Sequence, residues 1–249
     1  MRASIARWAR QAGLAVIIAL SSAATAAAGQ VTDAPAAADD VSEADIEASN
    51  GKIKAGYGAL VAMWSADFKQ LGVRFAPPGL LRYRGAARTS CGIMPGNNAM
   101  YCPSRNAIYF DEVFVARQAK AAARALGTDG DMVAVGIIAH EMGHAVAIQL
   151  GETSPVPYEN EATADCLAGA FTQQSRHDGT LEAGDLEEAF FGMAAAGDPT
   201  PQYTGNRRID SRISLRAALL GHGTRDQRMA NFRSGYDGGP STCLTAFRG

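Results

Sequence analysis

The chain has 249 residues, of which 47% are hydrophobic and 19% are charged, and its formal net charge is −2. This length suits one substantial domain or at most two small ones. The excess of lysine and arginine that neutralises phosphates is missing, so we expect no nucleic-acid partner. After the first thirty residues no apolar run is long enough to cross a bilayer, so we expect no membrane span in the mature chain.

The N-terminus has the three parts of a secretory signal peptide, which predicts that residues 1–28 are removed on export. Three arginines precede an apolar segment at residues 12–20, and three alanines at 26–28 form a small-residue cleavage site. An uncleaved membrane anchor is the alternative, because weakly apolar residues continue to position 28. We therefore expect an exported protein, either periplasmic or secreted.

Residues 29–50 carry six acidic and no basic side chains, which predicts a solvated, disordered acidic linker. A propeptide is the alternative, although this segment contains no cysteine that would block a metal site. Without residues 1–28 the chain has 20 basic and 25 acidic residues, a net charge of −5. Residues 51–249, with 20 basic and 19 acidic residues, form the predicted single folded domain, which is nearly neutral.

The first half of this domain predicts helices around a short strand. Apolar residues recur at helical spacing over residues 52–70, and the Pro77-Pro78 pair breaks the chain soon after. The run N-A-I-Y-F-D at 106–111 predicts a strand. A helix follows over residues 112–126, where Gly127 ends it.

A long helix is predicted from Asp131, as its N-cap, to Leu150, where Gly151 stops it. This helix is apolar on most sides, which is typical of a central, buried helix. Four more helices are predicted at residues 159–176, 181–196, 209–220 and 224–236. Strand signals are few, so the predicted fold class is α+β, a mostly helical domain with a small sheet.

Within the buried helix lies the motif H-E-M-G-H at residues 140–144. Imidazoles at i and i+4 project from one helix face, so His140 and His144 can bind the same tetrahedral ion. Glu141 lies between them, where it can reach a metal-bound water. This is the H-E-x-x-H arrangement of zinc hydrolases, and it predicts one Zn²⁺ ion. The alternative, two core histidines without a metal, is costly in so apolar a helix.

Two histidines leave the zinc short of a ligand, and the following segment N-E-A-T-A-D at 160–165 supplies candidates. Glu161 and Asp165 lie one helical turn apart. We expect Glu161 to be the third ligand and Asp165 to be the acceptor that fixes the tautomer of a ligating histidine. The opposite assignment, with Asp165 on the metal, is the alternative. The metzincin motif would require glycine in place of Ala147 and histidine in place of Leu150, and this chain has neither.

This set of residues predicts hydrolysis of a peptide bond in a polypeptide substrate. A zinc ion with three protein ligands activates a water, and Glu141 takes its proton and delivers it to the leaving amine. The oxyanion needs a further donor, for which His222 is the first candidate and Tyr203 and Tyr158 are others. An edge strand around residues 108–110 would hold an extended substrate through main-chain hydrogen bonds.

The four cysteines allow three pairings, and export favours disulfides over free thiols. Cys91 and Cys102 bracket a short turn-like stretch and would close a local loop. That leaves Cys166, on a predicted helix, to pair with Cys243. A cysteine zinc site is the competing interpretation, but no two of these residues form a C-x-x-C pair.

The chain resembles the neutral zinc metallopeptidase family of bacteria, a zincin-like group. The resemblance covers residues 51–249 and is carried by separated blocks in the same order: H-E-M-G-H, Y-C-P-S-R-N-A-I-Y-F-D at 101–111, A-D-C-L-A-G at 164–169, L-E-A-G-D-L-E-E-A at 181–189 and H-G-T-R-D-Q-R at 222–228. It implies a zinc peptidase with His140 and His144 as ligands and Glu141 as the catalytic acid and base. It also supports the disulfide pairing and a role for the block that begins at His222.

The leading hypothesis is therefore an exported zinc endopeptidase. One alternative is a zincin fold that binds metal but serves as a regulatory or binding module, although such a module would not need Glu141. A second is a zinc amidase that acts on cell-wall amides. The sequence indicates no particular oligomeric state.

Overall fold

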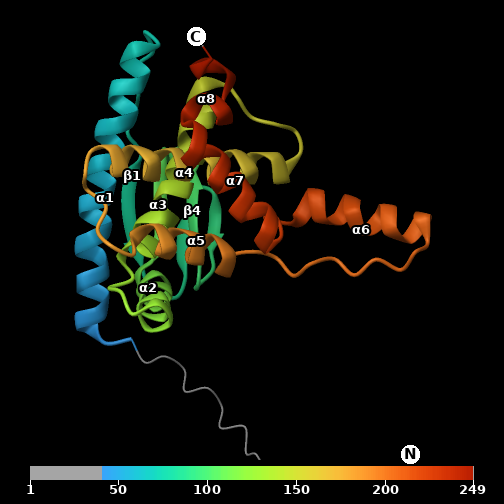
Figure 1. The fold of residues 1–249 in the computed structure, drawn as a ribbon, viewed down its shortest axis with the longest axis horizontal. Helices are drawn as coiled ribbons and strands as arrows, with labels where there is room; N and C mark the ends of the chain where they lie inside the picture. The colour runs from blue at the N-terminus through green and yellow to red at the C-terminus, as the bar shows by residue number, and fades with distance from the viewer. Residues whose placement is uncertain (1–40, 249) are drawn as a thin grey trace, which may run out of the picture. The chain divides into compact units, whose positions relative to one another are not determined.

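The structure, a computed structural model, describes residues 41–248. The predicted signal peptide and residues 29–40 of the acidic segment lie outside the described residues. The described part of the chain has the predicted α+β fold, in which helices predominate and the strands form two small sheets (Figure 1).

Helix α1 (Glu43–Gln70) begins nine residues before the predicted start at residue 52. Ser42 and Asp45 form a capping box, in which each side chain accepts a hydrogen bond from the other's backbone N–H. Ile46 packs into the interior. Residues 43–50 are therefore helical, and the prediction of a disordered linker up to residue 50 is wrong. Two of the six acidic residues that suggested a linker, Glu43 and Asp45, lie in the first turn of this helix, where negative charge is favourable.

The other predicted helices are present, with ends that differ by a few residues. In chain order the helices are α2 (Glu112–Leu126), α3 (Asp131–Leu150), α4 (Pro157–His177), α5 (Asp185–Ala195), α6 (Arg207–Leu220), α7 (Arg225–Gly238) and α8 (Pro240–Cys243), with 3₁₀ turns at Pro103–Arg105 and Thr245–Phe247. Gly127 and Gly151 end α2 and α3 in the left-handed conformation, as predicted. The N-cap of α3 is Gly130, and Asp131 is its first helical residue.

Helix α3 lies at the centre of the fold and contacts α1, α2, α4, α5 and the strands β4 (Ala99–Cys102) and β5 (Ala107–Asp111). By length and composition alone it is the one helix among residues 41–248 apolar enough to cross a membrane. Because 72% of that apolar window is buried against its neighbours, α3 serves here as a core helix.

The larger sheet has the strand order β1-β5-β4. Strand β1 (Gly79–Tyr83) runs parallel to β5 (Ala107–Asp111), and β4 (Ala99–Cys102) runs antiparallel to β5 on its other side. Strand β5 is therefore paired on both sides, and the prediction of an edge strand around residues 108–110 is wrong. Strand β1, which the sequence did not reveal, occupies one side of β5, while β4 is the sheet edge that contacts α3.

A separate hairpin, β2 (Ala87–Thr89) with β3 (Gly92–Met94), precedes β4. Two disulfides join the pairs that the sequence suggested. Cys91–Cys102 ties this hairpin to the end of β4, and Cys166–Cys243 ties α4 to α8.

Helices α4 and α7 cross with their backbones in direct contact. A Cβ atom on Gly169 would lie 1.9 Å from the carbonyl oxygen of Phe232, and one on Gly235 would lie 1.7 Å from that of Cys166. Only glycine fits at these two positions, so the pair sets how closely α7 can approach α4.

Helix α6 extends away from the other helices (Figure 1), and none of its residues is buried. The chain leaves for this excursion at Asp198 and returns beside it, because Asp198 N–H donates to the carbonyl oxygen of Gly223 at 2.8 Å. The Asp198 carboxylate also accepts from the backbone N–H groups of His222 and Gly223. Both ends of the segment that contains α6 are thus fixed beside Asp198, and His222 lies at the end where the chain returns.

Candidate metal centre

The two histidines of the H-E-M-G-H motif are one turn apart on α3, with ring centroids 4.8 Å apart. The third residue of the cluster, Glu161, comes from α4. Its Oε2 atom is 3.2 Å from Nε2 of His140, and its Oε1 atom is 3.5 Å from Nε2 of His144. One donor atom from each of the three residues lies within 4.8 Å of the other two.

The glycine of the motif explains how α4 reaches this position. A Cβ atom on Gly143 would lie 2.9 Å from both Cα and the carbonyl oxygen of Ala164. Real Cβ atoms do not make such contacts, so the glycine lets the backbone of α4 pack directly against α3 between the two histidines. Glu161, one turn before Ala164, is thereby carried to the imidazoles.

These donors fit a zinc ion. Two imidazole nitrogens and one carboxylate form a ligand set of catalytic zinc sites. The Oε2 atom of Glu161 is buried and lies 3.2 Å from Nε2 of His140, but it accepts no hydrogen bond of normal geometry from the described residues. A buried carboxylate oxygen without a partner is costly, and coordination of a cation would remove that cost.

In the metal-free protein a proton on His140 supplies the positive charge of this cluster. Burial alone would lower the pKa of His140, but the hydrogen bond to Asp165 and the close contact with the Glu161 carboxylate outweigh it and raise the pKa to about 10. Burial raises the pKa of Glu161, yet the close contact with His140 and the charges of His140 and His144 bring it down to about 2. Burial and the neighbouring charge of His140 lower the pKa of His144 to about 4. His144 is therefore neutral at pH 7, whereas His140 must release the proton on its Nε2 atom to bind a metal.

Asp165 accepts a hydrogen bond from Nδ1 of His140 at 2.8 Å, on the opposite side of the ring from Glu161. The guanidinium of Arg228, from α7, donates to both Asp165 oxygens, from Nη2 at 2.6 Å and from Nε at 3.0 Å. A third donor atom of Arg228, Nη1, bonds the carbonyl oxygen of Ala196. This chain of contacts holds the proton of His140 on Nδ1 and leaves Nε2 facing Glu161.

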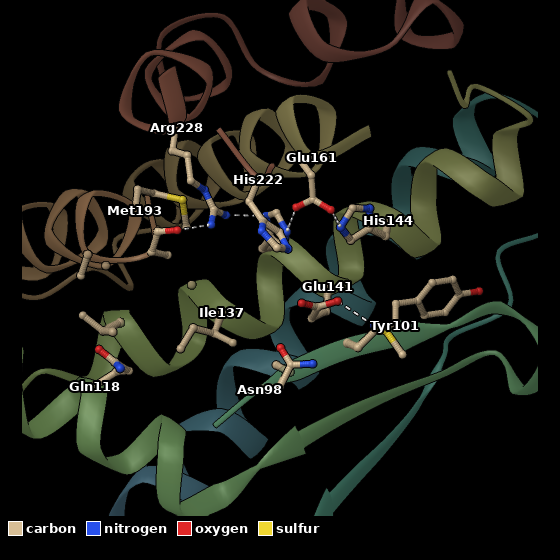
Figure 2. Close-up of a pocket in the computed structure, with 18 of the residues that line it drawn as sticks. Asn98, Tyr101, Gln118, Ile137, Glu141, His144, Glu161, Met193, His222 and Arg228 are labelled. Atoms are coloured by element: carbon tan, nitrogen blue, oxygen red, sulfur yellow. Dashed lines mark hydrogen bonds and ion pairs between the residues drawn. The ribbon is translucent and has the colours of Figure 1, made fainter. Parts of the chain in front are cut away.

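Glu141 is buried and points toward strand β4 (Figure 2). Its Oε2 atom accepts a hydrogen bond from the backbone N–H of Tyr101 at 2.7 Å. Burial raises the pKa of Glu141 above its usual value, and the hydrogen bond and the charge of His140 act in the opposite direction. The carboxylate is thus fixed by one oxygen and kept in surroundings that favour uptake of a proton.

A pocket of about 540 Å³ opens over this cluster. His140, Glu141, His144, Glu161 and His222 all line it, so the structure brings these residues together at one cavity. The His222 side chain is 62% exposed at the rim. Tyr203 and Tyr158 are not among the lining residues. The Tyr203 hydroxyl lies near that of Ser214, and Tyr158 packs against Gly223.

Two features of the site were missed in the sequence. Arg228 is buried at the end of the block H-G-T-R-D-Q-R, in which the sequence pointed to His222 alone. Strand β4, with the backbone N–H that holds Glu141, was not expected at all. The block itself was the available signal for Arg228, whereas nothing local marked β4 as the strand beside α3.

Residues 12–247 match the family described as "Putative neutral zinc metallopeptidase". Proteins of Escherichia coli strain K12 and of strain O6:H1, both called "Uncharacterized protein YpfJ", are 34% identical to the chain over 203 residues. The match covers 73% of this chain and 66% of each relative, so the chain spans less than two thirds of their length. No solved structure matches the chain significantly. The match over nearly the whole sequence shows that the chain belongs to the neutral zinc metallopeptidase family.

Proposed function

We propose that the protein is an exported endopeptidase that uses one zinc ion. The observation that carries this proposal is the convergence of one donor atom each from His140, His144 and Glu161, with the buried Oε2 atom of Glu161 accepting no hydrogen bond of normal geometry from the described residues. In this proposal these three residues hold the ion and Glu141 is the catalytic acid and base. When bound, zinc activates a water molecule and polarises the carbonyl of the scissile bond.

Glu141 has the position that proton transfer requires. The hydrogen bond from Tyr101 N–H occupies Oε2, which leaves Oε1 for the proton that is taken from water and then given to the leaving amine. The raised pKa of the buried carboxylate suits both steps, because a group that binds the proton too weakly cannot remove it from water.

Asp165 and Arg228 act as positioning residues. They fix the tautomer of His140 and are therefore expected to strengthen metal binding without contact with substrate. The geometry favours Glu161 over Asp165 as the third ligand, because both oxygens of Asp165 already accept hydrogen bonds from His140 and Arg228.

Strand β4 is the candidate platform for the substrate backbone. The N–H of Tyr101 points away from β5 toward Glu141, and alternation along a strand turns the N–H and carbonyl of Ala99 to the same side. Asn98, Ala99 and Met100 line the pocket, so an extended chain paired with this edge would pass over the metal centre. His222 at the rim is the candidate donor to the oxyanion.

The two disulfides support export to an oxidising compartment, because such bonds do not persist in a reducing cytosol. The periplasm and the cell exterior both meet this requirement.

Zinc content and hydrolysis of casein by purified variants test the proposal. Glu141→Gln should keep its zinc and lose hydrolysis, whereas Glu161→Ala should lose zinc. Asp165→Ala should bind zinc about 10–100-fold more weakly, because it loses only the support of His140. Glu187→Gln, an exposed carboxylate on α5 outside the pocket, is the matched control and should behave as wild type.

Three results would contradict the proposal. If neither Glu161 nor Asp165 affects zinc occupancy, the ligand assignment is wrong. If zinc-loaded wild type and Glu141→Gln are equally inactive on a broad peptide library, the protein is a metal-binding module. If peptidoglycan is cleaved and casein is not, the protein is an amidase.

A further inference from the structure

The pocket over the metal centre has two chemically different ends. Its charged and ionisable lining residues, Glu141, Glu161, Arg228 and the three histidines, belong to the metal end. The other lining residues are apolar or neutral, and the larger ones toward the second end are Met100 of β4, Phe114 and Gln118 of α2, Met132, Val133 and Ile137 of α3, and Met193 of α5. Figure 2 shows Ile137 and Gln118 on the far side of Glu141 from His144.

Gly136 keeps this second end open. It lies one turn before His140 on α3, lines the pocket and is buried. A Cβ atom built on it would nevertheless meet no atom within 4 Å. Because residue 136 is buried and lines the pocket, the empty space beside its Cα atom is the pocket itself. Any side chain at this position would therefore occupy the pocket.

A second glycine, Gly192 of α5, lines the same pocket. A Cβ on Gly192 would meet the Val133 side chain at 3.4 Å, so this position is filled by ordinary packing and is not open. Gly136 differs, because no packing contact requires it to be glycine. A glycine inside a helix lowers stability by about 0.5–1 kcal/mol relative to alanine. At residue 136 the glycine leaves empty volume in the pocket next to the metal centre.

We propose that this apolar end is the binding site for one large apolar side chain of the polypeptide substrate, such as leucine, methionine or phenylalanine, and that Gly136 sets the size it accepts. This proposal rests on the proposed peptidase function, because it places the apolar side chain next to the peptide bond that is cleaved beside Glu141. A charged substrate side chain would lose its hydration at this end without gaining an ionic partner, since the polar groups there are the neutral Gln118 and Asn98.

The first experiment uses the zinc-loaded full-length chain and a peptide library in which one position is varied, with cleavage sites read by mass spectrometry. Wild type should cleave next to leucine, methionine or phenylalanine with kcat/KM at least about tenfold above alanine, aspartate or lysine at that position. Gly136→Leu, which fills the pocket, should lower kcat/KM for the large apolar peptides at least about tenfold more than it lowers kcat/KM for the alanine peptide.

Gly136→Ala should fold at least as stably as wild type and shift the preference toward smaller side chains. Gly58→Leu is the matched control, because Gly58 is an exposed helical glycine on α1 whose Cβ would also meet no atom within 4 Å. This control should retain wild-type specificity. Zinc content, measured on every variant, should equal that of wild type.

Binding of the same peptides to Glu141→Gln, measured by fluorescence anisotropy, separates the pocket from the catalysis. The pocket is supported if Glu141→Gln binds the phenylalanine peptide tightly and the double variant Gly136→Leu/Glu141→Gln does not. This result would hold even if wild type cleaves no peptide and the peptidase function is wrong. If wild type cleaves peptides with no apolar preference, or if Gly136→Leu leaves the preference unchanged, the pocket assignment is overturned while the peptidase function stands.

Discussion

The carboxylate of Asp165 links two cationic partners from different helices. It is fully buried, accepts from His140 of α3 and receives two donors from Arg228 of α7. A buried carboxylate shared in this way is satisfied only while both helices stay in place. The orientation of His140 therefore depends on α7, although α7 supplies no donor to the proposed metal.

A second buried carboxylate, Asp185, predicts a pH dependence of stability. Burial raises its pKa to about 6, and the charges of Asp131, Glu188 and Asp129 add to this effect. Lys52 pairs with Asp129 and Asp131 and with neither Glu188 nor Asp185. Because the folded state holds the proton of Asp185 more tightly than the unfolded chain, ionisation lowers stability as the pH rises from about 4 through 6.

We expect Asp185→Asn to melt at a higher temperature than wild type at pH 8, and the difference to vanish near pH 4. Asparagine keeps the oxygen that accepts from Glu182 N–H and removes only the charge. Thermal unfolding across this pH range is the measurement. Asp210→Asn is the opposite-sign control, because backbone hydrogen bonds lower the pKa of Asp210, and the variant should gain no stability at pH 8. A lower melting temperature for Asp185→Asn at pH 8 would contradict the argument.

At the scale of elements, the sequence predicted the features that depend on neighbouring residues, such as the ends of helices. The glycines Gly127 and Gly151 mark the ends of α2 and α3 because the left-handed conformation that they adopt is a property of single residues. Strand pairing depends on distant segments. Nothing within residues 107–111 indicates that β1, from the region after Pro77-Pro78, covers one side of β5, so the edge of the sheet was misplaced.

The crossing of α4 and α7 predicts an effect of a single methyl group. Gly235→Ala would place a Cβ against the backbone of Cys166, which cannot move aside as a side chain can. We expect a loss of about 1–3 kcal/mol in the free energy of unfolding. We also expect zinc to bind about tenfold more weakly, since a displaced α7 withdraws Arg228 from Asp165.

Urea denaturation and competition with a chelator measure these two losses in Gly235→Ala. Gly58→Ala, in open space on α1, is the control and should gain about 0.5–1 kcal/mol from helix propensity. Unchanged stability of Gly235→Ala would show that the helices can separate without cost, which the close contact argues against.

At the scale of the whole molecule, a residue of the candidate site could be predicted from the sequence when it lies close along the chain to the residues that it contacts. His140, Glu141 and His144 were identified because a helix brings i and i+4 together, and Glu161 because it opens the next helix. Arg228 is 63 residues from Asp165, and only the packing of α7 on α4 brings them together. Helical periodicity carries no information about such contacts.

The two disulfides should differ in their contribution to stability. Cys166–Cys243 closes a segment of 77 residues and Cys91–Cys102 one of 11. In the chain-entropy view these loops correspond to about 4.5 and about 3 kcal/mol of destabilisation when the bond is removed. We expect the double serine variant at residues 166 and 243 to unfold at lower denaturant concentration than the one at 91 and 102. Equal midpoints, or the reverse order, would contradict this expectation.

The Cys166–Cys243 bond also has a consequence for the timing of assembly. Ribosomes add about 5–20 residues per second, so Cys243 is made about 4–15 s after Cys166. All three proposed zinc ligands precede Cys166 in the chain, whereas Arg228 and Cys243 come long after it. The nascent chain therefore carries a complete set of donors before it carries the groups that orient and secure them. In the proposed function, the residues that orient His140 and secure α4 are therefore among the last parts of the site to be synthesised.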